Sequence, residues 1–146
     1  MKLDAVYYEQ AIFDYPLGRQ IRDEYGDLPW IPIESHNSIR EMQEKPNDQF
    51  GHMKRNLIAG IRKTHKYVEN HKVSDYLVPY TSSGCTAMCL YCYLVCNYNK
   101  CAYLRLFVNR EQMLDRMIKK GKNSGKPLTF EIGSNSDLVL ENTEAR

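Results

Sequence analysis

The sequence contains no long apolar run and no secretory leader. A membrane-spanning helix needs roughly 20 consecutive apolar residues, and no such run occurs. Residues 1–8 lack the basic start, apolar core and small-residue cleavage site of a signal peptide. Neither sign of charge is in large excess, because 20 Lys and Arg residues face 18 Asp and Glu residues. We therefore expect a globular, cytoplasmic protein with no membrane partner.

Cysteine is missing from the first 84 residues and from everything after residue 101. The five cysteines that do occur are Cys85, Cys89, Cys92, Cys96 and Cys101. An odd number of cysteines in so short a stretch is a poor disulfide framework. The clustering instead favours a reducing compartment in which thiolates hold a metal.

The first three cysteines have the spacing Cys85-x-x-x-Cys89-x-x-Cys92. Three thiolates on one loop can ligate three irons of a [4Fe-4S] cluster and leave the fourth iron open to a substrate or cofactor. A structural zinc site would need a fourth ligand and more often pairs two Cys-x-x-Cys units. The spacing therefore favours an iron–sulfur cluster, with a non-catalytic zinc-binding module as the alternative.

Several short motifs accompany the cysteines. They are Gly84-Cys85, Cys89-Leu90-Tyr91-Cys92-Tyr93-Leu94, Tyr103-Leu104-Arg105, Val108-Asn109, Phe130-Glu131 and Ser136-Asp137. Together they resemble the radical S-adenosylmethionine (SAM) enzymes and, among them, the spore photoproduct lyase family, from Tyr8 to Glu141. The resemblance implies a DNA repair lyase that reverses a thymine–thymine ultraviolet lesion in spore DNA. It also implies a [4Fe-4S] cluster, S-adenosylmethionine and a reducing electron donor.

The resemblance assigns roles to individual residues. It implies that the three cysteines of the motif ligate the cluster and that Tyr91 lies near the adenine of the cofactor, although Tyr91 has packing as its alternative role. Ser136 matches a position that contacts the amino-acid end of the cofactor, and Asp137 lies beside it. Both also suit a turn or cap at the end of a strand.

The resemblance further implies a radical relay through Tyr91 and Tyr93, fed by a cysteine that donates hydrogen to the thymine radical. In this chain Ser134 stands at that cysteine's place, and an aliphatic hydroxyl holds its hydrogen too strongly to replace a thiol. Cys96 or Cys101 is the candidate substitute. We favour Cys96, four residues beyond Cys92, although either thiol is equally consistent with a buried or stray cysteine.

Hydrophobic patterns predict the elements of the first half. Strands are expected at Ala5–Glu9 and Trp30–Ile33, the second at a sheet edge because Pro32 cannot donate to a ladder. Apolar residues at helical spacing predict a helix from Tyr15 to Gly26. Ser35–Gln49 is expected to be a loop with one helical turn, and Leu57–Ile61 a buried strand.

Charged and ionisable residues of the first half have two interpretations each. Basic residues flank the expected strand at Lys54-Arg55 and Arg62-Lys63, where they would meet DNA phosphates or form a solvated flank. His36 and His52 are isolated histidines. We expect each to be exposed or hydrogen-bonded, since a lone histidine is rarely a metal ligand.

The second half has the order strand, cysteine loop, helix, strand. The strands are expected at Tyr76–Tyr80 and Leu128–Ile132, in parallel, and the helix from a cap at Asn109 to Ile118. Met113, Leu114, Met117 and Ile118 share one helix face, with the methionines in the core. In parallel α/β folds the site lies at the carboxyl ends of strands, which suits the cysteine loop.

We therefore predict an α/β fold in two parts. Residues 1–74 are expected to form an N-terminal α+β extension, and residues 75–146 the first βαβ portion of a partial radical SAM (β/α) barrel. A complete barrel takes roughly 250 residues, so the barrel is expected to be truncated and to need a C-terminal part as partner. A truncated protein, a split protein and an interrupted gene product all fit. A radical SAM enzyme with a different substrate is the alternative function.

Overall fold

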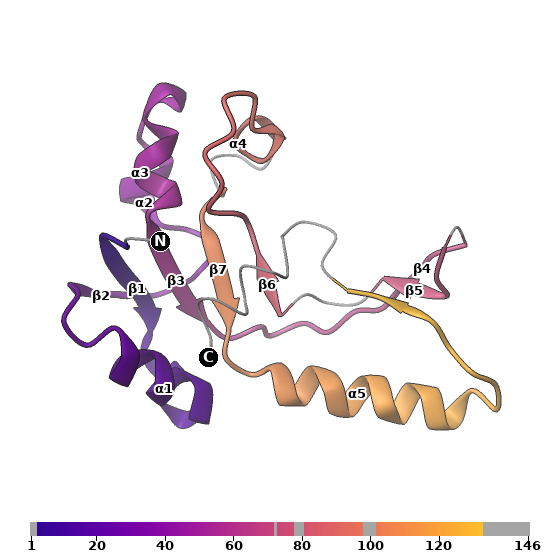
Figure 1. The fold of residues 1–146 in the computed structure, drawn as a ribbon. Coiled ribbons are helices and arrows are strands. Elements are labelled where there is room, and N and C mark those ends of the chain that lie inside the picture. Colours follow the sequence, from indigo (N-terminus) through magenta and orange to yellow (C-terminus); the bar gives the residue numbers. More distant parts are fainter. Residues whose placement is uncertain (1–2, 72, 78–80, 98–101, 133–146) are drawn as a thin grey trace.

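The computed structural model describes residues 3–71, 73–77, 81–97 and 102–132, whose strands form two sheets (Figure 1). The larger sheet has the order β2-β1-β3-β7-β6 and the smaller sheet the order β4-β5-β8. The strands are β1 (Ala5–Glu9), β2 (Trp30–Ile33), β3 (Asn56–Gly60), β4 (Val68–Glu69), β5 (Tyr76–Leu77), β6 (Ser82–Ser83), β7 (Leu104–Phe107) and β8 (Phe130–Glu131). The helices are α1 (Pro16–Glu24), α2 (Arg40–Gln43), α3 (Phe50–Lys54), α4 (Tyr93–Asn97) and α5 (Arg110–Asn123), with 3-10 turns at Gln10–Asp14 and Asn47–Gln49.

Strands β1 and β3 form the buried centre of the larger sheet. They pair in parallel, and all five residues of β3 are buried. Successive side chains of a strand point to opposite faces, so each strand contributes to two apolar clusters. One cluster lies on the α1 face and includes Val6, Leu17, Ile21 and Leu57. The other lies on the α2 and α3 face and includes Tyr7, Met42, Met53 and Ile58.

Local sequence patterns predict β1, β2, α1 and β3 of the first half correctly. Strand β1 has the predicted bounds, and β2 lies at the sheet edge, where the missing N–H of Pro32 costs no ladder bond. Helix α1 begins with Pro16 in its first turn, and its end is closed by the Tyr25 N–H, which donates to the Ile21 carbonyl at 2.9 Å. The buried strand at residues 57–61 is confirmed as β3.

Three features of the fold differ from the prediction. Within the first 74 residues, β1 to β3 run parallel and alternate with helices, where the sequence suggests α+β, whereas β4 pairs antiparallel with β5. Helix α2 lies where the single helical turn is expected, and α3 is a further helix beyond Gln49 that the pattern does not predict. Strand β7, which the sequence analysis leaves out, pairs in parallel with β3. The larger sheet thus joins residues from both predicted parts, and the division after residue 74 stays a prediction.

The parallel pairing of β5 with β8 is confirmed, and α5 lies between them in the chain. Residues 78–80 of the first predicted strand lie outside the described residues. Helix α5 contacts the smaller sheet, because the Tyr67 hydroxyl donates to the Met113 carbonyl at 3.2 Å and the Lys120 ammonium lies 4.1 Å from the centre of the Tyr76 ring. No helix within the described ranges is long and apolar enough to cross a membrane.

The apolar stripe of α5 is only partly covered. Met113 is buried and Met117 partly so, as predicted, whereas Leu114 is 45% and Ile118 55% exposed. Asn109 occupies the N-cap position, but its side chain makes no bond to the helix backbone. Its amide oxygen instead accepts the Arg62 N–H at 2.9 Å, which ties the start of α5 to the segment after β3.

Candidate metal centre

The cysteine loop begins at a glycine that no other residue could replace without strain. Strand β6 pairs antiparallel with β7, and Gly84 follows with a φ of +88°. A side chain at Gly84 would collide with the backbone carbonyl of Tyr103. The Cys85 N–H then donates to the Ala102 carbonyl at 3.3 Å. The glycine therefore lets the loop start against the residues that lead into β7.

The strand before the loop is not the expected one. It is β6, and because β6 runs antiparallel to β7, the loop leaves at the amino end of β7. The carboxyl ends of the parallel strands in the larger sheet lie at the opposite edge. The sequence places Cys85 after the strand Tyr76–Tyr80, whose residues 78–80 lie outside the described residues, so that placement stays a prediction.

The three motif cysteines differ in exposure. Cys85 and Cys92 are partly buried and pack against an apolar cluster formed by Leu94, Val95 and Ala102. Cys89 is exposed at the tip of the loop. Among the described residues, no three side chains of His, Cys, Asp or Glu lie close enough together to hold a metal ion. The fold thus brings the cysteines to one region without converging their sulfurs.

Lys54, at the end of α3, is fully buried beside this loop. Its Nζ has no hydrogen-bond partner among the described atoms. Burial would raise the pKa of the Cys92 thiol, but backbone N–H groups of Val95 and Leu94 and the positive charge of Lys54 outweigh it, so this pKa lies below its usual value. The environment of Cys92 therefore favours a thiolate.

This donor set fits an iron–sulfur cluster. Cluster irons take cysteine thiolates as ligands, and three thiolates bring negative charge to one loop. An isolated buried ammonium is costly unless an opposite charge lies nearby. Lys54 supplies the complementary charge at Cys92, so its unpaired position has a physical reason once the thiolates carry a cluster.

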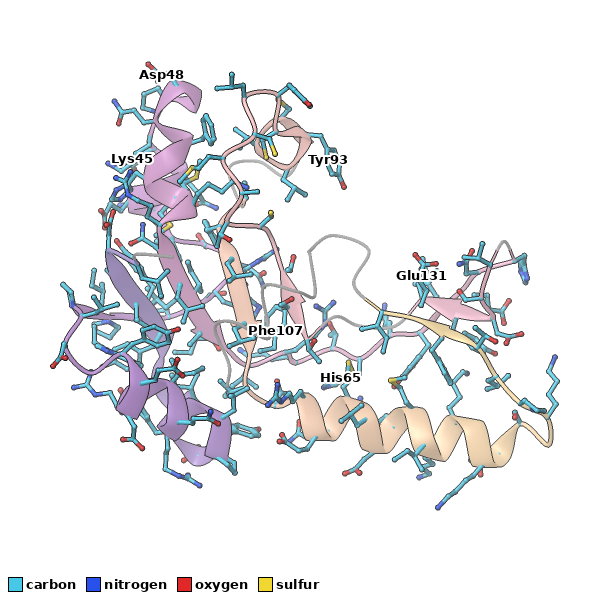
Figure 2. The ribbon with its side chains drawn as sticks, in the orientation of Figure 1. Lys45, Asp48, His65, Tyr93, Phe107 and Glu131 are labelled. Atoms are coloured by element: carbon cyan, nitrogen blue, oxygen red, sulfur yellow. The ribbon has the colours of Figure 1, made fainter. Side chains whose placement is uncertain are left out.

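A hollow of about 300 Å³ opens beside the loop, between α3 and α4. Its lining includes Phe50, Cys89, Tyr91, Cys92, Val95 and Cys96. Tyr91 is 91% exposed, and Tyr93, labelled on α4 in Figure 2, is 54% exposed. The structure thus brings Cys96 and Tyr91 to the same hollow as two motif cysteines, whereas Cys85 and Tyr93 are not part of its lining.

Other predicted site residues cannot be placed. Cys101, Ser134, Ser136 and Asp137 lie outside the described residues. The role of Lys54 is not predicted from the sequence, in which Lys54 belongs to a basic flank expected to meet DNA phosphates or solvent. The only signal for its burial is its place one turn after Phe50 in a short helix that the pattern does not predict.

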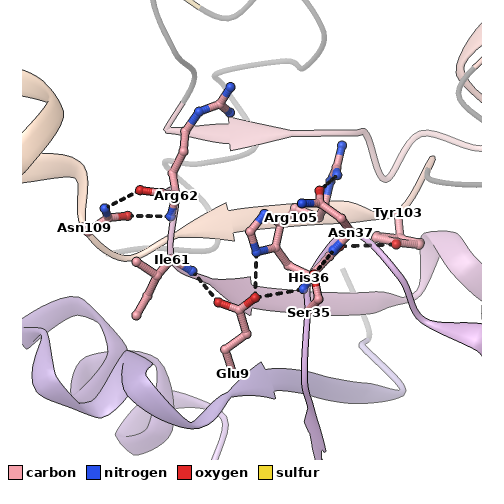
Figure 3. Close-up of polar contacts among 9 residues, drawn as sticks. All are labelled: Glu9, Ser35, His36, Asn37, Ile61, Arg62, Tyr103, Arg105 and Asn109. Atoms are coloured by element: carbon pink, nitrogen blue, oxygen red, sulfur yellow. Dashed lines mark hydrogen bonds and ion pairs between the residues drawn. The ribbon is translucent and has the colours of Figure 1, made fainter. Parts of the chain in front are cut away.

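A second polar cluster joins the ends of three segments of the larger sheet (Figure 3). One Glu9 oxygen accepts the His36 backbone N–H at 2.9 Å and lies 2.8 Å from His36 Nδ1. The other Glu9 oxygen accepts the Ile61 N–H at 2.9 Å. His36 is therefore hydrogen-bonded, as one of its two predicted interpretations requires.

The pKa values of this cluster are shifted. Burial raises the pKa of Glu9, but bonds from His36 and Ile61 outweigh it and leave the pKa lower than usual. Burial lowers the pKa of His36, and the charges of Arg105 and Arg62 add to this effect against the opposing influence of Glu9. The folded protein thus favours a charged Glu9 and a neutral His36.

Comparison with known proteins places this loop and sheet in a defined family. The family model for spore photoproduct lyase matches residues 1–143. The chain is 34% identical over 139 residues to the spore photoproduct lyase of Bacillus subtilis (strain 168) and 29% identical over 139 residues to that of a Geobacillus species. Each match covers 92% of this chain and 40% of the relative. The chain belongs to the spore photoproduct lyase family and spans about 40% of the length of these relatives.

Solved structures show the same fold. A spore photoproduct lyase complexed with dinucleoside spore photoproduct superimposes with a TM-score of 0.85 at 26% identity, over 98% of this chain and 43% of that chain. A variant of the enzyme with bound AdoMet and dinucleoside spore photoproduct has a TM-score of 0.86 at 24% identity, with the same coverage. The second likeness concerns the fold alone. The predicted family and its restriction to an N-terminal part are confirmed.

Proposed function

We propose that this chain is the cluster-binding N-terminal part of a lyase that repairs the spore photoproduct in DNA. The observation that carries the proposal is the loop Cys85-x-x-x-Cys89-x-x-Cys92 in a chain that belongs to the spore photoproduct lyase family. The relatives are about two and a half times as long, so the barrel would be completed by residues that this chain does not include. The chain is accordingly the opening of a partial radical SAM barrel.

The three motif cysteines would hold a [4Fe-4S] cluster, and S-adenosylmethionine would bind at its open iron. When bound, these groups supply a 5′-deoxyadenosyl radical that begins cleavage of the lesion. Gly84 sets the direction in which the loop leaves β6, and Lys54 provides positive charge beside Cys92. Tyr91 lines the hollow next to Cys89 and Cys92, which suits a residue that contacts the adenine.

Ser136 and Asp137 would hold the amino-acid end of the cofactor, on the segment that follows β8. Electrons would come from a separate reducing protein or small donor. A lesion within a duplex must be exposed before it reaches an enclosed radical, so the whole enzyme would flip it out of the stack. The site itself would lie in the cytoplasm of a sporulating cell.

The hydrogen donor would differ from that of the family, because Ser134 replaces the usual cysteine. Cys96 is exposed and shares its hollow with Tyr91, so a thiol is available next to the first tyrosine of the proposed relay. Tyr93, on the same helix as Cys96, would be the second relay residue. In this relay Cys96 gives a hydrogen atom to the thymine radical and recovers one from a tyrosine.

The first test is anaerobic reconstitution of the chain with iron and sulfide. We expect a broad visible absorption that bleaches with dithionite. A colourless protein that retains zinc would contradict the cluster. Activity is then measured with a chimera in which this chain replaces the corresponding part of the B. subtilis enzyme and acts on dinucleoside spore photoproduct. A chimera that carries the cluster but repairs nothing would favour a radical SAM enzyme with another substrate.

The donor is tested in the same chimera with Cys96→Ala and Cys101→Ala. Loss of the Cys96 thiol is expected to slow repair and to raise the fraction of by-products from unquenched thymine radical. The Cys101 variant serves as the matched control, since it removes the other spare thiol. Clean repair by the Cys96→Ala chimera at the parent's rate would exclude this cysteine as donor.

A further inference from the structure

A pocket of about 420 Å³ lies among the carboxyl ends of β1, β3 and β7 and reaches Ser83 at the end of β6. Its lining includes Glu9, His36, Arg62, Lys63, Ser83 and Arg105. These residues come from the ends of β1 and β3, from the loop after β2, and from β6 and β7. Figure 3 draws Glu9, His36, Arg62 and Arg105. None of them is a cluster ligand or a relay residue of the proposed reaction.

The connections of the sheet make this position a natural binding site. From β1 the chain moves to β2 on one side and then returns to β3 on the other side of β1. The strand order therefore reverses between β1 and β3. In open α/β sheets, ligands bind outside the carboxyl ends of strands at such a reversal. Glu9 ends β1, and Arg62 follows the end of β3, so the pocket lies at this point.

The charge of the pocket is predominantly positive. Three cationic side chains, Arg62, Lys63 and Arg105, line it together with the single carboxylate of Glu9. Both oxygens of Glu9 already accept hydrogen bonds, from His36 and Ile61. The Glu9 carboxylate thus links β1 to the segments after β2 and β3. Because both of its oxygens are hydrogen-bonded, a bound anion would interact mainly with the three cationic side chains.

The Arg105 guanidinium is held in place by neutral groups. One terminal nitrogen donates to the Asn37 amide oxygen and the other to the Ser83 hydroxyl, both at 2.9 Å. Its Nε is buried without a hydrogen-bond partner, and Arg105 takes part in no ion pair among the residues that the structure describes. A fixed guanidinium without an opposite charge is a preorganised site for an oxyanion.

Arg62 is also oriented toward this pocket by its surroundings. Its guanidinium carbon lies 5.2 Å from the centre of the Phe107 ring, and Nε donates to the Thr64 carbonyl at 3.2 Å. The backbone on either side of it is fixed, because the amide group of Asn109 bonds both the N–H and the carbonyl of Arg62 at 2.9 Å. Two arginines, one in the segment after β3 and one in β7, are therefore positioned on one cavity.

We propose that this pocket binds a phosphate group, carried either by a free nucleotide or by a nucleic acid strand. Guanidinium groups match the geometry of phosphate oxygens, and the hydroxyl of Ser83 offers a further donor next to Arg105. The volume accommodates a phosphate with its attached sugar. The site is independent of the cluster and of the lesion chemistry.

Binding is measured by calorimetry on the cluster-free chain at low ionic strength, so that neither iron nor a lesion influences the result. The probes are inorganic phosphate, thymidine 5′-monophosphate, the dinucleotide pTpT and thymidine, which lacks phosphate. We expect saturable binding of the phosphate-bearing probes at one site and none of thymidine. Tighter binding of pTpT than of the mononucleotide assigns the site to a strand, and equal binding assigns it to a single phosphate group.

Variants distinguish binding at these particular arginines from attraction of anions by the net positive charge of the chain. Arg62→Gln and Arg105→Gln should each weaken binding roughly tenfold or more, the usual effect of losing a charged hydrogen bond. Arg105→Lys keeps the charge but loses the planar fork, so it should also weaken binding. Lys126→Gln removes one exposed positive charge elsewhere and should leave binding unchanged. Far-ultraviolet circular dichroism establishes that each variant is folded.

Two results would overturn the proposal. One is the absence of saturable binding of any phosphate-bearing probe by the folded parent chain. The other is equal weakening by Lys126→Gln and Arg62→Gln, which would show attraction by net charge alone. Arg62→Gln keeps the inference testable should the Arg105 variants fail to fold, because the structural bonds of Arg62 to Asn109 come from its backbone.

Discussion

Two regions of the molecule, the pocket at the strand ends and the cysteine loop, differ in how their side chains are held in place, although β6 and β7 contact both regions. In the pocket, Glu9 and Arg105 are fixed by hydrogen bonds to Ile61, His36, Asn37 and Ser83 without any ligand. In the loop, Cys89 is exposed and the cysteine sulfurs do not converge. Protein contacts alone therefore organise the pocket, whereas the proposed cluster would have to bring the cysteine ligands of the loop together.

The largest effect expected from this contrast is on iron binding. Cys89→Ala should abolish bound iron, because a second iron of the cluster would lose its protein ligand. The same change should alter the unfolding free energy of the cluster-free chain by less than about 0.5 kcal/mol, since Cys89 is exposed. Iron and sulfide analysis after reconstitution measures the first effect and urea unfolding the second. Full iron content in the variant would show that the ligand assignment is wrong.

The reverse pattern is expected in the pocket. Glu9→Gln should lower the unfolding free energy by about 2–4 kcal/mol, because an amide cannot accept all the bonds that the buried carboxylate accepts. Iron binding should be unchanged. Glu34→Gln is the matched control, since Glu34 is exposed. Equal stability of the two variants in urea would mean that the Glu9 bonds do not organise the pocket.

A substitution at Lys54 should have opposite consequences in the cluster-free chain and in the chain that carries the proposed cluster. The Lys54 ammonium is buried beside the Cys92 thiol and has no carboxylate partner among the described residues, so Lys54→Met should stabilise the cluster-free chain by about 1–3 kcal/mol. In the reconstituted protein the same change should make the cluster harder to reduce, because a nearby positive charge is lost. Urea unfolding and a redox titration measure the two effects. A variant that is less stable without the cluster and unchanged in potential would contradict this role.

The smallest expected effect is the pH dependence of stability. Glu9 and His36 both have lowered pKa values in the folded protein, so the unfolded chain binds more protons and stability rises with pH. Stability should begin to fall below the ordinary histidine value of 6.5 and fall further below the ordinary glutamate value of 4.5. His36→Gln should reduce the first of these two decreases, and the remainder should come from His65, whose pKa burial also lowers. An unchanged profile between pH 7 and pH 5 in that variant would show that His36 does not cause it.

The sequence predicts those parts of the fold that depend on local patterns. The alternation of Trp30–Ile33, the helical spacing after Pro16 and the apolar run at Leu57 each determine one element, and the structure confirms them. The cysteine spacing likewise predicts the ligand set, because three ligands within eight residues need no tertiary contact to lie on one loop.

Features that depend on long-range contacts were beyond such reasoning. Strand β6 is only two serines long, and Arg105 interrupts the apolar run of β7, so neither has a strand pattern of its own. The sequence around Lys54 is typical of an exposed basic flank, and Lys54 is buried only because α3 packs against the larger sheet. The phosphate pocket gathers residues that are up to 98 positions apart, from Glu9 to Phe107, which only the strand order of the larger sheet brings together.

The central claim is that the cysteine loop holds a cluster with one open iron. The most direct test is electron paramagnetic resonance of the anaerobically reconstituted and reduced chain, with and without S-adenosylmethionine. We predict the signal of a reduced [4Fe-4S] cluster whose shape changes when the cofactor binds. A reduced cluster with the same spectrum in both samples, or a protein that binds zinc and forms no cluster, would contradict the account.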